Sequence, residues 1–119
     1  MAGATDNKGL LITALNQKIN PVVSGPYDCW YSFNLRGQRY NPREDCEWVS
    51  GKITTEDKIG FLYGHLEARI KTTGTAGTWP AFWMLGQDFQ KVGWPGCGEI
   101  DIHEGNGAIP NSNWGTLHG

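Results

Sequence analysis

Hydrophobic and polar positions alternate with a period of two in several short parts of this chain, and such alternation predicts β-strands. No 3.6-residue periodicity continues for three helical turns, so no helix of normal length is expected. Residues 16–46 contain prolines and glycines at irregular intervals and are expected to form a long loop. The strands are expected at residues 10–15, 48–54, 61–71, 79–85, 97–104 and 114–118.

The faces of two of these strands carry candidate binding residues. In residues 61–71, apolar side chains such as Leu66 fall on one face, and Glu67 and Arg69 fall on the other with aromatic rings. Aromatic rings beside polar groups are typical of a sugar-binding surface, but a polar outer face is also usual for an antiparallel sheet. Trp79 and Trp83 share one face of the next segment. They would either line a groove, as candidate substrate-binding residues, or fill the core.

Three acidic residues, Glu99, Asp101 and Glu104, form the most informative segment. Glu99 and Asp101 are two residues apart, so a strand places them on the same face. Strict alternation would place Glu104 among the isoleucines of the opposite face, where an unpaired carboxylate is costly. One extra residue near 102–103, a β-bulge, would return Glu104 to the face of the other two acids. We therefore expect a bulge and a row of three carboxylates.

A row of neighbouring carboxylates is suited to general acid and base chemistry. Repulsion between neighbouring negative charges raises the pKa of one carboxyl group relative to that of the other. Two carboxyl groups about 5–5.5 Å apart suit retaining glycoside hydrolysis. The intervening Asp101 could share a proton with the nucleophile. A calcium site and a merely exposed acidic strand explain the same spacing, and the three alternatives stay open on spacing alone.

Composition excludes several other classes of function. Among 119 residues, 10 Lys+Arg and 12 Asp+Glu give a formal net charge of −2, so no basic surface suggests a nucleic-acid partner. No apolar run approaches the ~18 residues of a membrane span, so no membrane association is expected. The 17 glycines and 6 prolines favour short strands and turns. The first residues lack the pattern of a signal peptide, and we interpret them as an initiator Met joined to a mature segment.

The three cysteines leave two interpretations open. Cys29 and Cys46 could form a disulfide in an exported protein, with Cys97 left free, or all three could be reduced and buried. A zinc site is not expected, because no paired CxxC occurs and the three histidines are scattered.

A resemblance to a known family rests on several linked motifs. Residues 99–104 fit the pattern ExDxxE, which resembles the signature of glycoside hydrolase family 16. Residues 63–71, 79–86, 93–98 and 115–119 are similar to the surrounding family motifs and occur in the right order. The resemblance covers residues 10–119, weakly over 16–46 and strongly over 50–119. The lead-in at residues 94–98 looks most like the laminarinase branch, the endo-β-1,3-glucanases.

The resemblance implies a role for each matching residue. Glu99 would be the nucleophile, Asp101 its assistant and Glu104 the general acid/base. His103 should point away from the groove and receives no role. The implied substrate-binding residues are Glu67 and Arg69 on the glycone side, Trp79 and Trp94 as cleft aromatics, and His118 near the reacting sugar.

The resemblance also implies the fold, the activity and the cellular setting. The expected fold is all-β, a concanavalin-like β-jelly-roll sandwich of two curved antiparallel sheets, of which residues 1–119 would hold about half, with a loop insertion at about 16–46. The expected activity is retaining endo-hydrolysis of β-1,3-glucan or mixed-linkage β-glucan by a secreted enzyme. No cofactor would be required, and a structural calcium ion would bind outside this segment. The alternatives are a non-catalytic, lectin-like glucan-binding sandwich and an inactive fragment completed by a second chain or by self-association.

Overall fold

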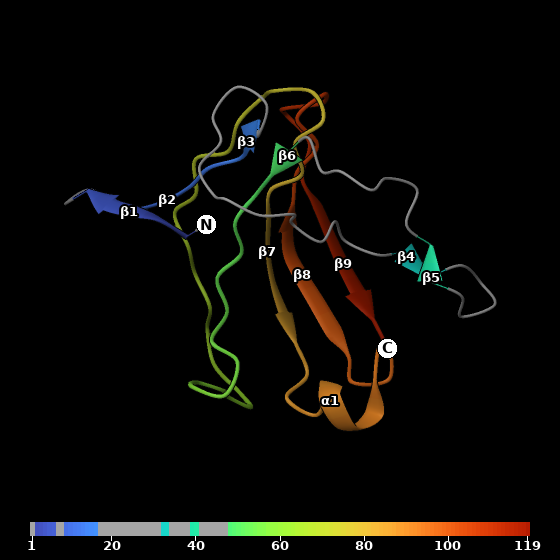
Figure 1. Ribbon diagram of the computed structural model, residues 1–119. Coiled ribbons are helices and arrows are strands. Elements are labelled where there is room, and N and C mark those ends of the chain that lie inside the picture. The colour runs from blue at the N-terminus through green and yellow to red at the C-terminus, as the bar shows by residue number, and fades with distance from the viewer. Residues whose placement is uncertain (1, 7–8, 17–31, 34–38, 41–47) are drawn as a thin grey trace, which may run out of the picture. The chain divides into compact units, whose positions relative to one another are not determined.

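The computed structural model describes residues 2–6, 9–16, 32–33, 39–40 and 48–119 (Figure 1). The chain divides into two compact units, Met1–Thr54 and Thr55–Gly119, and each is described by itself. No helix in the described ranges is long and apolar enough to cross a membrane. The expected disulfide between Cys29 and Cys46 and most of the expected loop at 16–46 lie outside the described residues.

The first unit contains three two-stranded antiparallel pairs. The expected strand at residues 10–15 is divided in two, because its halves pair with different partners. The expected strand at 48–54 is confined to its first two residues. Three strands were not expected: β1, and β4 and β5, which lie within the expected loop. The pairs are β1 (Ala2–Asp6) with β2 (Gly9–Ile12), β3 (Leu15–Asn16) with β6 (Trp48–Val49), and β4 (Ser32–Phe33) with β5 (Arg39–Tyr40).

The second unit contains a three-stranded antiparallel sheet in the order β7-β8-β9 (Figure 1). Its strands are β7 (Ala81–Leu85), β8 (Glu99–Glu104) and β9 (Trp114–His118), so β8 is central and paired on both sides. A single helical turn, α1 (Phe89–Val92), lies in the connection from β7 to β8. These strands confirm the all-β prediction, and β9 has the predicted bounds.

Backbone chemistry explains why β7 and β8 each begin two residues later than expected. Pro80 has no N–H to donate to a ladder, so regular pairing of β7 starts at Ala81. Gly98 has a φ of 77°, a left-handed conformation that ends the preceding turn and lets β8 begin at Glu99. A Cβ at Gly86 would overlap the carbonyl oxygen of Cys97, so the two sides of the turn approach this closely only with glycine there.

Both ladders of β8 contain the predicted β-bulge. On the β7 side, Phe82 pairs with His103 and Trp83 pairs with Asp101, so Ile102 is the extra residue. On the β9 side, the register is shifted between Asp101 and Glu104. The expected position of the bulge, near residues 102–103, is confirmed.

The prediction of a long strand at residues 61–71 is wrong. The structure describes this segment without strand geometry, and no backbone ladder joins it to another described residue. Alternation gives a strand only where a neighbour accepts the backbone hydrogen bonds. Gly64, with a φ of 150°, also interrupts the extended backbone.

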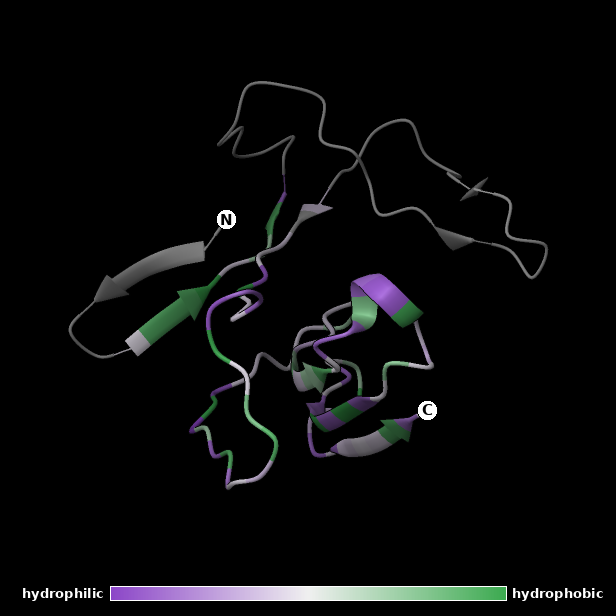
Figure 2. Ribbon diagram, turned by 90° about the horizontal axis from the view of Figure 1, so that it is seen from below, coloured by the Kyte–Doolittle hydropathy of each residue, from purple (hydrophilic) through white to green (hydrophobic). Residues whose placement is uncertain are grey.

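One face of the three-stranded sheet is apolar but not buried. Ile100 pairs with Met84 on one side and Leu117 on the other, which defines this face opposite Asp101. Ile100 is 44% exposed and Leu117 is 76% exposed. Where side-chain burial is described, no hydrophobic residue is buried. Figure 2 shows hydrophobic and hydrophilic positions next to one another along these strands.

Candidate functional site

The central strand β8 places three carboxylates on one face of the sheet. Asp101 pairs with Thr116 of β9, so their side chains share a face. The hydroxyl of Thr116 donates a hydrogen bond of 3.3 Å to Oε2 of Glu104. Glu104 therefore lies on the face of Asp101, and alternation places Glu99 there too. The structure brings the three predicted catalytic residues together.

Indole groups hold the two ends of this carboxylate row. Nε1 of Trp94 donates a hydrogen bond of 2.6 Å to Oε2 of Glu99. Nε1 of Trp79 donates one of 3.0 Å to Oε1 of Glu104. Hydrogen bonds to a carboxylate are stronger than those between neutral groups, so both acids have a fixed orientation. Two of the tryptophans expected to line the cleft thus contact the acids directly.

Local backbone bonds explain the position of each tryptophan. The turn that carries Trp94 is closed by a bond of 2.9 Å from the Cys97 N–H to the Gly93 carbonyl. Beyond the strand ends, the Gly105 N–H donates to the Pro80 carbonyl at 2.9 Å. This bond continues the pairing of β7 with β8 and keeps Trp79 beside Glu104.

Asp101 and His118 form the middle of the site. Asp101 is 5% exposed and is the buried polar residue among those described. Nε2 of His118 lies 3.2 Å from Oδ2 of Asp101, and the His118 ring lies 5.5 Å from the Trp94 ring between centroids. His118, predicted near the reacting sugar, thus lies beside the acid between the two proposed catalytic glutamates.

The surroundings of Glu99 raise the pKa of its carboxyl group. Burial raises this pKa above its ordinary value, while the hydrogen bond from Trp94 lowers it. The negative charge of Asp101 and a hydrogen bond with it raise the pKa further, and His118 lowers it. Glu99 and Asp101 are thus hydrogen-bonded to each other, as the sequence interpretation of a shared proton requires.

Two further residues of the site received no role from the sequence. Trp114 packs against Trp79 with 5.1 Å between ring centroids, and Thr116 is bonded to Glu104. Alternation already places both on the face of His118. Their contacts depend on the register of β9 against the bulged β8, which the sequence pattern alone does not give.

Not every predicted binding residue contacts the carboxylate row. Trp83 pairs with Asp101 and so lies on the carboxylate face, partly buried. Arg69 is exposed. The carboxylate of Glu67 accepts a hydrogen bond of 3.2 Å from His65, also at the surface. The substrate-binding roles of Glu67 and Arg69 stay predictions.

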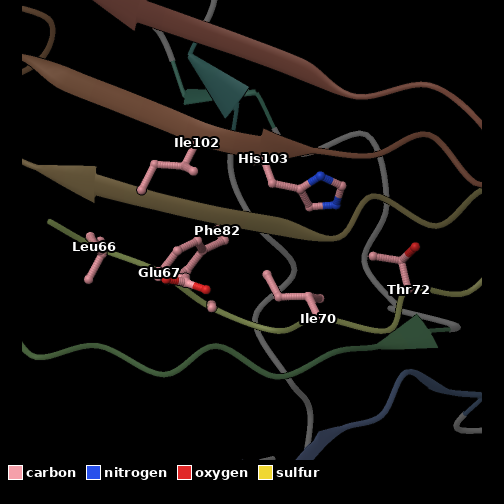
Figure 3. Close-up of a pocket in the computed structure, with 8 residues that line it drawn as sticks. Leu66, Glu67, Ile70, Thr72, Phe82, Ile102 and His103 are labelled. Atoms are coloured by element: carbon pink, nitrogen blue, oxygen red, sulfur yellow. The ribbon is translucent and has the colours of Figure 1, made fainter.

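A cavity of about 370 Å³ lies on the other side of β8 (Figure 3). His103 lines it next to the extra residue Ile102, and Nδ1 of His103 is hydrogen-bonded to Oδ1 of Asn113. The prediction that His103 points away from the groove is confirmed. Further lining residues are Leu66, Glu67, Ile70 and Phe82.

Comparison with known proteins agrees with this geometry. The family model for glycosyl hydrolases family 16 matches residues 8–119. The chain belongs to glycosyl hydrolase family 16. Members of family 16 are β-jelly rolls, which confirms the fold class predicted from the sequence.

Relatives of the family 16 chain include two named as glucanases. It is 41% identical over 78 residues to glucan endo-1,3-beta-glucosidase A1 of Niallia circulans, covering 66% of this chain and 11% of that protein. It is 38% identical over 114 residues to glucan endo-1,3-beta-glucosidase of Cryptopygus antarcticus, covering 96% and 38% respectively. A beta-1,3-glucan-binding protein of Penaeus monodon is 41% identical over 69 residues, covering 58% and 18%. The chain thus spans well under half the length of each relative. No solved structure matches it.

The donor set of the family 16 site bears on the calcium alternative. Glu99, Asp101 and His118 offer ligand atoms within 4.8 Å of one another, the group of this kind found in the described part of the chain. Calcium prefers six to eight oxygen ligands. A set of three residues that includes an imidazole does not fit calcium.

Proposed function

We propose that this family 16 chain is part of a retaining endo-glycosidase that hydrolyses β-1,3-glucan or mixed-linkage β-glucan. The observation that carries the proposal is the bulge at Ile102, which returns Glu104 to the face of Glu99. A nucleophile and an acid on one surface are what a double displacement at a glycosidic bond needs.

The reaction proceeds in two steps. In the first, the Glu99 carboxylate attacks the anomeric carbon while Glu104 protonates the departing glycosidic oxygen, so a covalent glycosyl ester replaces the glycosidic bond. In the second, Glu104 takes a proton from water, which attacks the same carbon and releases Glu99. Two inversions restore the original configuration.

The residues between and beside the glutamates prepare these steps. Asp101, buried beside Glu99 and hydrogen-bonded to it, holds the nucleophile in position. The Trp94 indole N–H stabilises the charged form of the nucleophile. The Trp79 N–H holds Glu104 in place as it changes from acid to base.

The substrate class follows from the aromatic surface beside the acids. Trp79 and Trp94 are each 55% exposed although both are hydrogen-bonded to a carboxylate, so their rings are free to cover sugar faces. The names of the relatives from Niallia circulans and Cryptopygus antarcticus support a β-1,3-linked glucan. Glu67, Arg69 and His118 are assigned to substrate binding on the family resemblance, and Trp83 is assigned to it because it shares a strand face with Trp79.

The test is product analysis with the purified protein on laminarin and lichenan, with the anomer of the first product followed by NMR. We expect β-configured oligosaccharides of several lengths. Glu99→Gln should lower kcat by at least ~10³-fold, as removal of a nucleophile does. Glu56→Gln, at an exposed glutamate that accepts a hydrogen bond from Gln90, is the matched control. An α-configured first product would contradict the mechanism.

A second candidate function is glucan binding without hydrolysis. The exposed tryptophans and the relative named as a glucan-binding protein favour it. Affinity electrophoresis in laminarin gels separates the two functions. If the protein is a lectin, laminarin in the gel should retard the parent protein and Glu99→Gln to the same extent, and neither should release sugar from laminarin.

We also infer that the apolar face of β8 is covered in the working protein, by a complementing chain or by self-association. The exposure of Ile100 and Leu117 supports this. Light scattering after gel filtration tests it, since a monomer at all concentrations would contradict self-association. Secretion and a calcium ion bound outside this segment stay predictions.

A further inference from the structure

We propose that Glu99, Asp101 and His118 bind a divalent transition-metal ion of the Zn²⁺ or Cu²⁺ class, and that the bound ion blocks the nucleophile. The three residues each offer one ligand atom, and these atoms lie within 4.8 Å of one another. Zinc bonds of about 2.0–2.2 Å in tetrahedral geometry place donors about 3.4 Å apart. His118 and Asp101, at 3.2 Å, already have this spacing, so only Glu99 must move, by about an ångström.

A buried atom without a partner points independently to a ligand. Oδ2 of Asp101 is inaccessible to solvent and makes no hydrogen bond, although the side chain carrying it is only 4% exposed. Nε2 of His118 lies 3.2 Å away, but its direction does not make a hydrogen bond. An unsatisfied buried carboxylate oxygen is costly. A cation between the two atoms would satisfy both lone pairs.

The donor chemistry selects the class of ion. One imidazole nitrogen and two carboxylate oxygens, with a fourth position open to water, form the type of three-residue set that holds zinc in accessible sites. Imidazole also suits copper, whereas calcium and magnesium require more oxygen ligands than this cluster offers.

Inhibition is the functional consequence, and this part rests on the proposed hydrolase function. An ion that binds the Glu99 lone pairs removes the electrons that would attack the anomeric carbon. The ion and the glucan therefore compete for one site. Zn²⁺ should raise the apparent KM for laminarin, and EDTA should restore it.

The binding experiment needs no catalysis. Calorimetric titration of the purified protein with Zn²⁺ should show a site whose dissociation constant rises about 10–100-fold in His118→Gln. His65→Gln is the matched control, because His65 is also paired with a carboxylate at 3.2 Å but lies at the surface, away from the cluster. Cysteine thiols bind zinc alike in all variants, so the difference between variants carries the result. Equal affinity in His118→Gln and the parent protein would overturn the proposal.

A second readout covers the case in which His118→Gln does not fold. The Trp94 ring lies 5.5 Å from the His118 ring, so bound Cu²⁺ should quench Trp94 fluorescence. Quenching should be smaller in Trp94→Phe, because Trp83 and other tryptophans near the row remain, while calorimetry still detects binding. Undiminished quenching without Trp94 would place the ion elsewhere and refute the site. If the protein binds zinc but does not hydrolyse laminarin, only the proposed hydrolase function is contradicted. If it hydrolyses laminarin but does not bind zinc, only the proposed metal site is contradicted.

Discussion

The hydrogen bond from Trp94 to Glu99 gives the sharpest test of the proposed mechanism. Trp94→Phe keeps an aromatic ring but removes the N–H that lies 2.6 Å from the carboxylate. A hydrogen bond to a charged group contributes about 1.5–3 kcal/mol, and we take the lower part of that range because Trp94 is 55% exposed. One pH unit corresponds to about 1.4 kcal/mol, so loss of this hydrogen bond should move the ionisation of the Glu99 nucleophile to a pH about one unit higher.

The assay is the pH profile of kcat/KM on laminarin, measured with EDTA to exclude metal ions. Burial already raises the pKa of Glu99, and losing the Trp94 donor acts in the same direction. Since Glu99 must be ionised to attack, activity is lost as pH falls through that pKa. The acidic limb of the profile should therefore move to higher pH by about one unit, with little change at its plateau.

Trp79→Phe is the matched control, because it removes the equivalent donor from Glu104 at the other end of the row. Glu104 acts first as the acid and not as the nucleophile, so this variant should leave the acidic limb in place. An acidic limb that stays fixed in Trp94→Phe, or the same limb moving in both variants, would show that the roles of the two glutamates are misassigned.

Three other predictions concern stability and geometry. Glu99→Gln should raise the melting temperature at pH 7, because ionisation of Glu99 with its raised pKa costs stability, and the gain should vanish as pH falls from that raised pKa to the ordinary pKa of a glutamate. A melting temperature that drops at pH 7 would contradict this. Gly86→Ala should lower the melting temperature by several degrees, since its Cβ would overlap the Cys97 carbonyl, and an unchanged value by calorimetry would mean that the turn relaxes. Deletion of Ile102 removes the extra residue, so Glu104 then follows Asp101 by two residues of a regular strand and stays on its face; hydrolysis should survive the deletion, whereas Glu104→Gln should abolish it. Loss of hydrolysis in a folded deletion variant would contradict this account of the bulge.

Local rules were enough to predict the carboxylate row. The period of two places Glu99 and Asp101 together, and the cost of burying a lone carboxylate among isoleucines requires a bulge before Glu104. Both arguments use neighbouring residues only. The bulge lies where they place it, with Ile102 as the extra residue.

Predictions that depended on contacts between residues far apart in the sequence were less accurate than those for the carboxylate row. Residues 61–71 alternate clearly, but alternation does not supply the neighbouring strand that would accept their hydrogen bonds. β1 has little hydrophobic pattern of its own, and it is a strand because it pairs with β2. The contact between Trp114 and Trp79 likewise depends on register across three strands.

The distribution of burial in the sheet explains why the site was easier to predict than the fold. Asp101 is 5% exposed while Leu117, on the opposite face, is 76% exposed, so burial in this sheet is concentrated on the polar face. The carboxylate row is then held by the bulge, by the left-handed Gly98 and by indole hydrogen bonds rather than by hydrophobic packing behind it. The bulge, Gly98 and Trp94 each lie within a few residues of an acid, whereas Trp79 is 25 residues from the glutamate that it contacts. Substitution of Gly98 should consequently impair catalysis more than substitution of Leu117, although Leu117 is the larger side chain.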